Sequence, residues 1–211
     1  MAEVNYYDLH PGLGYGPFKF GSSIEDCRPY TEIYGERRER SMYPSEEALQ
    51  FLARTMEMAG QPPGEIDKSV ARVRENSLPQ KEFYQVTFFG KGRVDLRFKR
   101  DKLITVTIDK GDISVFLGGQ DLFVLDGFAI VEYVARQLNE NPYVDVNDDD
   151  IYFRENSIAL FGYSAGVENG SVRWSRPYDP KNPRPQRAIA IYDGPRRNNE
   201  NFTDRFIYRI I

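Results

Sequence analysis

The stretch "KEFYQVTFFGKGRVDLRFKRDKLITVTID", from Lys81 to Asp109, decides the fold class of this chain. Apolar and polar residues alternate in it, and short segments at Gly90 to Gly92 and at Lys99 to Lys102 interrupt the alternation. A period of two is typical of half-buried strands, and short polar or glycine-containing interruptions are typical of hairpin turns. The stretch therefore predicts three consecutive antiparallel strands.

Helical patterns flank these strands on both sides. "MYPSEEALQFLARTMEMAG" (42–60) predicts a helix that begins after Ser45 as N-cap and ends before Gly60, and "EIDKSVARVREN" (65–76) predicts a second one. "LDGFAIVEYVARQLNENP" (125–142) has the clearest helical spacing of apolar residues, and Pro142 is expected to stop it.

Further strands are expected after the central three. "DISVFLGG" (112–119) predicts a fourth strand, and "DDIYFRENSIALFGYS" (149–164) predicts a hairpin that turns at Glu155 and Asn156. "RAIAIYD" (187–193) and "RFIYRII" (205–211) predict the closing strands. Together these patterns predict a single α+β domain over residues 1–211, with a mostly antiparallel sheet and helices packed on one face.

Composition is that of an ordinary globular protein. Of the 211 residues, 40% are hydrophobic and 28% are charged, and there is one cysteine, which rules out an internal disulfide. No apolar run reaches the roughly 18 residues of a membrane helix, and the N-terminus resembles no secretory signal. We therefore expect a cytoplasmic protein that has no contact with a membrane.

Charge is distributed unevenly along the chain. Residues 101–172 hold 13 acids and 4 bases, a net charge of −9, whereas residues 173–209 hold 4 acids and 9 bases, a net charge of +5. The acidic part includes "DVNDDD" (145–150), and the basic part includes "RWSRPYDPKNPRPQR" (173–187). Such segments either face a charged partner or neutralise each other within the fold.

The N-terminal stretch "HPGLGYGPFKFGSSIEDC" (10–27) is glycine-rich but lacks a phosphate-binding pattern. Its glycines lead into a short strand rather than a helix, and no lysine occupies the position that a P-loop requires. Ser22 and Glu25 instead form S-x-x-E, which predicts a capping box, with a helix restart near Pro29. No cofactor is expected.

Catalytic and metal sites find little support in the residues. Cys27 and His10 are the only cysteine and histidine, and no nucleophile motif surrounds a serine. Asp145, Asn147 and Asp149 occupy the first three ligand positions of a calcium loop, but Asp150 replaces the required glycine and Asn156 replaces the terminal glutamate. Overall acidity also argues against nucleic-acid binding by the basic segment. We expect no catalytic residue, no metal and no nucleic acid.

One resemblance points to a function. "GPFKFGSSIEDC…YTEIYG" resembles the opening motif G-x-[IF]-x-[FL]-G-[MS]-[ST]-x-E-[ED] of small uncharacterised bacterial proteins, several of which look like immunity proteins that neutralise toxins from neighbouring cells. "ISVFLGGQDLFVLDGFAIVEYVARQLNENP" and the closing strands are similar to later elements of such proteins. Pro29 and the long segment 173–187 depart from their pattern. The resemblance implies a protein binder without catalytic residues.

The expected partner is a protein toxin, such as a nuclease or another enzyme with a basic groove. An acidic patch is expected to cover that groove, with aromatic side chains as anchors. The candidate residues are Asp145, Asp148, Asp149, Asp150, Trp174 and Tyr178. The alternative is a small enzyme or ligand-binding domain that uses a cleft between the sheet and its helices.

Overall fold

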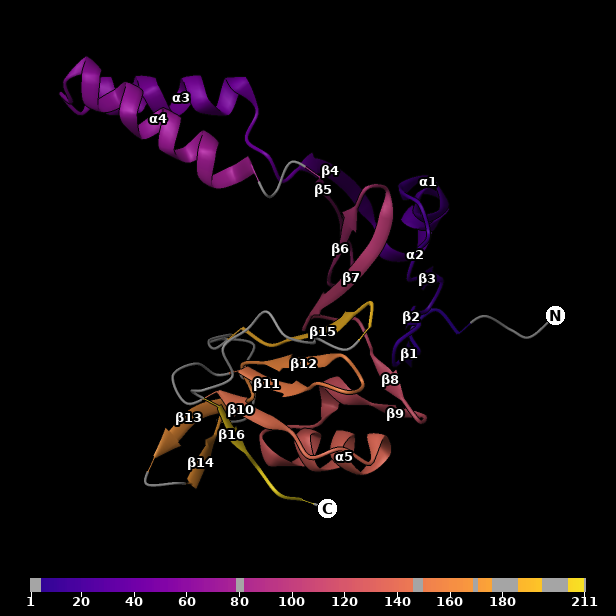
Figure 1. Cartoon of the computed structure of the whole chain (residues 1–211). Coiled ribbons are helices and arrows are strands. Elements are labelled where there is room, and N and C mark those ends of the chain that lie inside the picture. The colour runs from indigo at the N-terminus through magenta and orange to yellow at the C-terminus, as the bar shows by residue number, and fades with distance from the viewer. Residues whose placement is uncertain are drawn as a thin grey trace.

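A computed structural model of the chain describes residues 5–78, 82–145, 150–168, 171–175, 186–194 and 205–210. Its central feature is a nine-stranded sheet with the strand order β16-β10-β11-β12-β15-β7-β6-β5-β4 (Figure 1). All neighbouring strands in it are antiparallel. The strands are β4 (Glu36–Ser41), β5 (Phe83–Phe89), β6 (Arg93–Lys99), β7 (Lys102–Asp109), β10 (Tyr143–Asp145), β11 (Asp150–Phe153), β12 (Ile158–Phe161), β15 (Ala188–Tyr192) and β16 (Arg205–Ile207).

Strands β5, β6 and β7 occupy the alternating stretch, so the prediction of three consecutive strands there is confirmed. Alternate residues such as Val86, Leu96 and Val106 are completely buried on one face of the sheet. The turn between β6 and β7 has positive φ at Arg100 (49°) and Asp101 (60°), as a two-residue type I′ hairpin turn requires. The local pattern thus determined both the strands and the turn.

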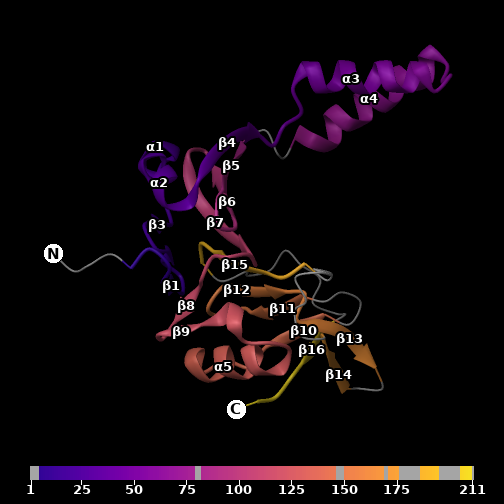
Figure 2. The same ribbon diagram turned by 180° about the vertical axis from the view of Figure 1, so that it is seen from behind.

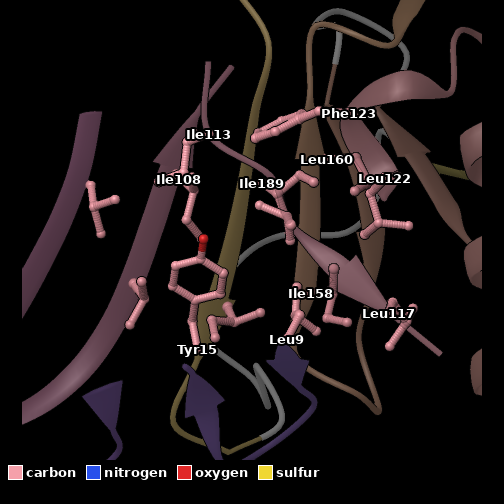
Figure 3. Close-up of a cluster of buried hydrophobic side chains, with 14 of the residues drawn as sticks. Leu9, Tyr15, Ile108, Ile113, Leu117, Leu122, Phe123, Ile158, Leu160 and Ile189 are labelled. Atoms are coloured by element: carbon pink, nitrogen blue, oxygen red, sulfur yellow. The ribbon is translucent and has the colours of Figure 1, made fainter. Parts of the chain in front are cut away.

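The N-terminal segment covers the buried face of these strands. It contains β1 (Leu9–His10), β2 (Gly14–Tyr15) and β3 (Phe18–Lys19), followed by α1 (Ile24–Cys27), the 3-10 helix η1 (Arg28–Tyr30) and α2 (Thr31–Tyr34). The Phe18 ring centre lies 5.5 Å from that of Phe88 on β5, and the Tyr34 ring centre lies 6.0 Å from it. Figure 3 shows the neighbouring part of this core, where Tyr15 and Leu9 meet side chains of the large sheet.

Helix α5 (Phe128–Leu138) covers the rest of the same face, below β10, β11 and β12 in Figures 1 and 2. Its residues Ile130, Val131, Val134 and Ala135 are completely buried. The helix ends at Asn139 in the left-handed conformation (φ 51°), three residues before the predicted stop at Pro142. The predicted α+β class, with a mostly antiparallel sheet, is confirmed.

The first helix begins one residue later than predicted. Its N-cap is Ser23, whose hydroxyl accepts a hydrogen bond from the Asp26 amide (3.3 Å), while the Asp26 carboxylate accepts one from the Ser23 amide (2.9 Å). The prediction of Ser22 was wrong because the Ser22 carbonyl accepts a hydrogen bond from the Leu103 amide of β7 (2.9 Å), which keeps Ser22 in the preceding turn. The restart near Pro29 is confirmed by η1 and α2.

The predicted fourth strand over 112–119 was also wrong in extent. Only β8 (Phe116–Leu117) is a strand, and it pairs with β9 (Gln120–Asp121) outside the large sheet. Gly118 and Gly119 have positive φ (57° and 84°) and turn the chain back, and η3 (Leu122–Val124) follows. A further separate pair comprises β13 (Ser164–Glu168) and β14 (Ser171–Trp174).

Helices α3 (Glu46–Met58) and α4 (Pro63–Ser77) form a hairpin inserted between the neighbouring strands β4 and β5. Ser45 is the N-cap of α3, as predicted. Unlike α5, this hairpin does not cover the sheet: in both views it projects to the side of β4–β7 opposite to α1 and α2 (Figures 1 and 2). Within the described ranges, no helix has the length and apolarity needed to cross a membrane.

Candidate functional site

Helix α3 has apolar side chains on two opposite sides. Leu49 is only 3% exposed, and with the half-buried Leu52 and Met56 it lies on the side that packs against α4. Phe51 and Met58 lie about two turns apart, and therefore on one common side of the helix. Their side chains are 71% and 80% exposed. The hairpin thus presents a second apolar stripe that its own partner helix does not bury.

Sequence reasoning missed this second stripe because it expected the helices to pack on one face of the sheet, whereas α3 and α4 pack against each other and project away from it. The signal in the sequence was the spacing of Phe51 and Met58, which are seven positions apart and lie on the side of the helix opposite to Leu49 and Met56. We call Phe51 and Met58 the exposed stripe of α3. Exposed apolar side chains on a projecting element are typical of protein contact sites.

The predicted acidic residues lie at one end of the large sheet. Asp145 ends β10 and Asp150 begins β11. Since Val144 pairs with Ile151, the next positions on the two strands place Asp145 opposite Asp150. Both are half-buried, and the Tyr152 hydroxyl donates a hydrogen bond to the Asp150 carboxylate (2.6 Å). Asp148 and Asp149 lie outside the described residues. The hairpin of β10 and β11 therefore brings Asp145 and Asp150 together, at the sheet end far from α3 and α4 (Figure 1).

Trp174, predicted as an aromatic anchor, is half-buried at the end of β14. Its ring centre lies 5.3 Å from those of Phe128 on α5 and Tyr208 near the C-terminus. The ring thus packs three separate segments together. Tyr178 lies outside the described residues.

The single cysteine and the single histidine occupy different surroundings. Cys27 is buried at the end of α1, and burial raises the pKa of its thiol to about 12. His10 belongs to β1 and pairs with Gly14. A thiol with so high a pKa is a poor nucleophile. Among the described residues no group of three His, Cys, Asp or Glu side chains is arranged to hold a metal ion.

An ion pair between a buried arginine and a half-buried aspartate lies where β15, β14 and the start of α5 meet. The Arg187 side chain is 1% exposed and pairs with Asp126, which directly precedes the N-cap of α5. Arg187 also donates a hydrogen bond to the Ser175 hydroxyl (3.2 Å), and its guanidinium carbon lies 4.8 Å from the centre of the Tyr163 ring. Burial raises the pKa of the Tyr163 hydroxyl. The pair joins segments 61 residues apart, which makes it a structural contact.

Cations gather on the face of β4–β7 that the helices leave uncovered in the described part of the chain. Arg40, Gln85 and Arg97 are neighbours in register across β4, β5 and β6. The Gln85 side-chain oxygen accepts hydrogen bonds from Arg40 Nε (3.2 Å) and Nη2 (2.8 Å). Lys99 pairs in register with Lys102 across the hairpin turn. We call Arg40, Arg97, Lys99 and Lys102 the cationic strip.

Sequence reasoning also missed the cationic strip, because its members come from three strands. The local signal was the alternation in "RVDLRFK" (93–99), which places Arg93, Asp95, Arg97 and Lys99 on one face of β6. Strand pairing then adds Arg40 and Lys102. Comparison of the chain with protein-family models, with curated proteins and with solved structures found no match.

Proposed function

We propose that this protein acts in the cytoplasm by binding another protein, as an immunity-type protein that neutralises a toxin by covering its active site. The observation that carries the proposal is the projecting α3–α4 hairpin with its exposed stripe, Phe51 and Met58. Large flexible or aromatic side chains are the usual anchors of protein interfaces, where they fill pockets on the partner. A hairpin that stands clear of the sheet can enter a groove without rearrangement of the protein body.

The acidic residues Asp145 and Asp150 support the same proposal in a different way. Their side chains come from neighbouring strands at one hairpin end, where they add to the acidic character of residues 101–172. Charge of one sign steers a partner of the opposite sign and mainly raises the association rate. In this proposal the hairpin anchors the toxin, and the acidic residues attract its basic groove.

The alternative of an enzyme or ligand-binding domain needs a cleft between the sheet and its helices. In the described residues this interface is filled on the α5 side by completely buried side chains. A small pocket on the sheet near Tyr152, Arg154 and Tyr192 has room for about one water molecule. Within the described residues, neither the filled interface nor this pocket is the cleft that the alternative requires.

The experiment begins with the products of genes adjacent to the one that encodes this chain. Each product is expressed in a bacterial host alone and together with this protein, and growth is measured. We expect one product to stop growth alone and to be harmless in the presence of this protein. If every toxic product remains toxic when this protein is present, the proposed function is wrong.

Affinity measurements with the product that this protein neutralises then test the anchor. Replacing Phe51 and Met58 together by alanine is expected to weaken toxin binding about tenfold or more, because each anchor is worth about 1 kcal/mol or more. The thermal unfolding midpoint should not fall, since both side chains are exposed. Arg72→Ala with Glu75→Ala on the exposed side of α4 is the matched control, and it should leave binding unchanged. Equal losses in both variants would show that the stripe is not the anchor.

A further inference from the structure

The cationic strip carries an excess of positive charge, of which the nearby Glu82 carboxylate, itself paired with Arg100, offsets only a part at Lys99. None of Arg40, Arg97, Lys99 and Lys102 takes part in an ion pair with the described residues, whereas Arg38 and Arg93 on the same face pair with Glu36 and Asp95. Lys99 and Lys102 lie directly opposite each other. Like charges at directly opposite positions destabilise a sheet. An anionic group that binds over Lys99 and Lys102 would relieve this repulsion.

Two of the four cations are held in place by neighbouring aromatic surface, and a third by an amide. The Arg97 guanidinium carbon lies 4.5 Å and the Lys99 ammonium 5.5 Å from the centre of the Phe83 ring. Arg97 Nε is buried there without a hydrogen-bond partner among the described residues. The Gln85 side chain holds Arg40 in turn, and it donates a hydrogen bond to Asp95 (2.9 Å). Positions fixed in advance lower the entropy cost of binding an anion.

We infer that the cationic strip binds an acidic, extended segment of another protein. Arg97 and Lys99 are two positions apart on β6, a spacing of about 6.8 Å, which matches alternate side chains of an extended acidic segment. Arg40 lies two strands away, at about 9.6 Å. Arginine recognises carboxylates through paired hydrogen bonds. The positive charge of the strip therefore calls for an occupant with negatively charged carboxylate side chains.

A nucleic acid fits the same surface less well. Single strands bind to sheets largely by stacking bases on aromatic rings, but here cations already cover Phe83, and the Arg38 guanidinium carbon lies 5.1 Å from the Phe89 ring centre. The acidic protein segment is therefore the favoured occupant.

The test uses a fluorescein-labelled oligoglutamate peptide and an oligothymidine of equal charge, with fluorescence anisotropy at low and at physiological ionic strength. We expect saturable binding of oligoglutamate, weakened about fivefold or more in Lys99→Gln with Lys102→Gln. The stability of this double variant to urea should hold or rise, since repulsion between the two lysines is removed. The matched control, Arg54→Gln with Arg72→Gln, removes the same charge from the exposed sides of α3 and α4 and should change the affinity less than about twofold.

Three outcomes would overturn the inference. The first is no saturable binding of oligoglutamate at low ionic strength, and the second is an equal loss of affinity in the control variant. The third is tighter binding of oligothymidine than of oligoglutamate, which would assign the strip to nucleic acid. Since the probe is not a toxin, these outcomes are independent of the growth assay that tests the proposed function.

Discussion

Replacing Asp126 by asparagine tests whether the ion pair with Arg187 holds β15, β14 and α5 together. The Arg187 side chain is 1% exposed and that of Asp126 is 38% exposed. The substitution keeps the size of the side chain but removes the carboxylate charge. Arg187 then retains its charge in the interior, against the Tyr163 ring and the Ser175 hydroxyl.

The size of the effect follows from the unequal burial of the two partners. Removing one partner of a fully buried ion pair costs about 3–5 kcal/mol, because the other charge stays buried without compensation. Asp126 is partly hydrated, which weakens the pair, so we expect about 2–3 kcal/mol for Asp126→Asn. Arg187→Met should cost less, since the Asp126 carboxylate left behind can be hydrated. The double variant should be no less stable than Asp126→Asn alone.

Equilibrium unfolding in urea measures these differences, provided that the slope with urea concentration stays constant. Asp193→Asn is the matched control: Asp193 is an exposed acid just after β15, and its loss should change the free energy of unfolding by less than about 0.5 kcal/mol. The reasoning fails if Asp126→Asn costs no more than this control. It also fails if Arg187→Met is the more damaging of the two single changes.

Three other expectations concern the cap of α1, the Cys27 thiol and the acidic residues 148–150. Ser23→Ala should lower the free energy of unfolding by about 1 kcal/mol, and Ser22→Ala should leave it nearly unchanged, because only Ser23 caps α1; equal effects in thermal or urea unfolding would contradict this assignment. Burial raises the pKa of Cys27 to about 12, so its thiol stays protonated at neutral and mildly alkaline pH. A thiol reagent should therefore label native protein far more slowly than urea-unfolded protein, and rapid native labelling would refute burial. Replacing Asp148 to Asp150 by asparagines should leave stability unchanged or raised, because an asparagine oxygen at position 150 can still accept the Tyr152 hydrogen bond, and it should slow association with the proposed toxin, with a flatter salt dependence in stopped-flow kinetics. Unchanged association kinetics would remove these three aspartates from the proposed interface.

Local signals in the sequence were enough to place many of the elements. The alternation over 81–109 and the helical spacing over 125–138 depend on which side chains recur on one face, which is a property of neighbouring residues. Ser45 could be predicted as a cap for the same reason, since a cap bonds to amides within its own first turn. These elements required no knowledge of the rest of the chain.

Contacts between distant residues decided what the sequence could not show. Ser22 fits the local capping pattern as well as Ser23 does. Ser23 is the N-cap because the Leu103 amide donates a hydrogen bond to the Ser22 carbonyl and keeps Ser22 in the preceding turn. Phe51 is exposed because the α3–α4 hairpin projects away from the sheet. The spacing of apolar residues alone would predict that Phe51 is buried. The cationic strip could not be predicted from the sequence for the same reason, because only strand pairing brings Arg40 beside Gln85 and Arg97.

The sequence by itself thus determined the α+β class, the three central strands and the helices α3, α4 and α5, because spacing, caps and turns act over a few residues. Only the tertiary structure decided which faces are covered. It joined Asp126 to Arg187, set Asp145 beside Asp150 and gathered the cationic strip from three strands. Pairing and burial link residues through space, and their energies depend on contacts that no local pattern contains.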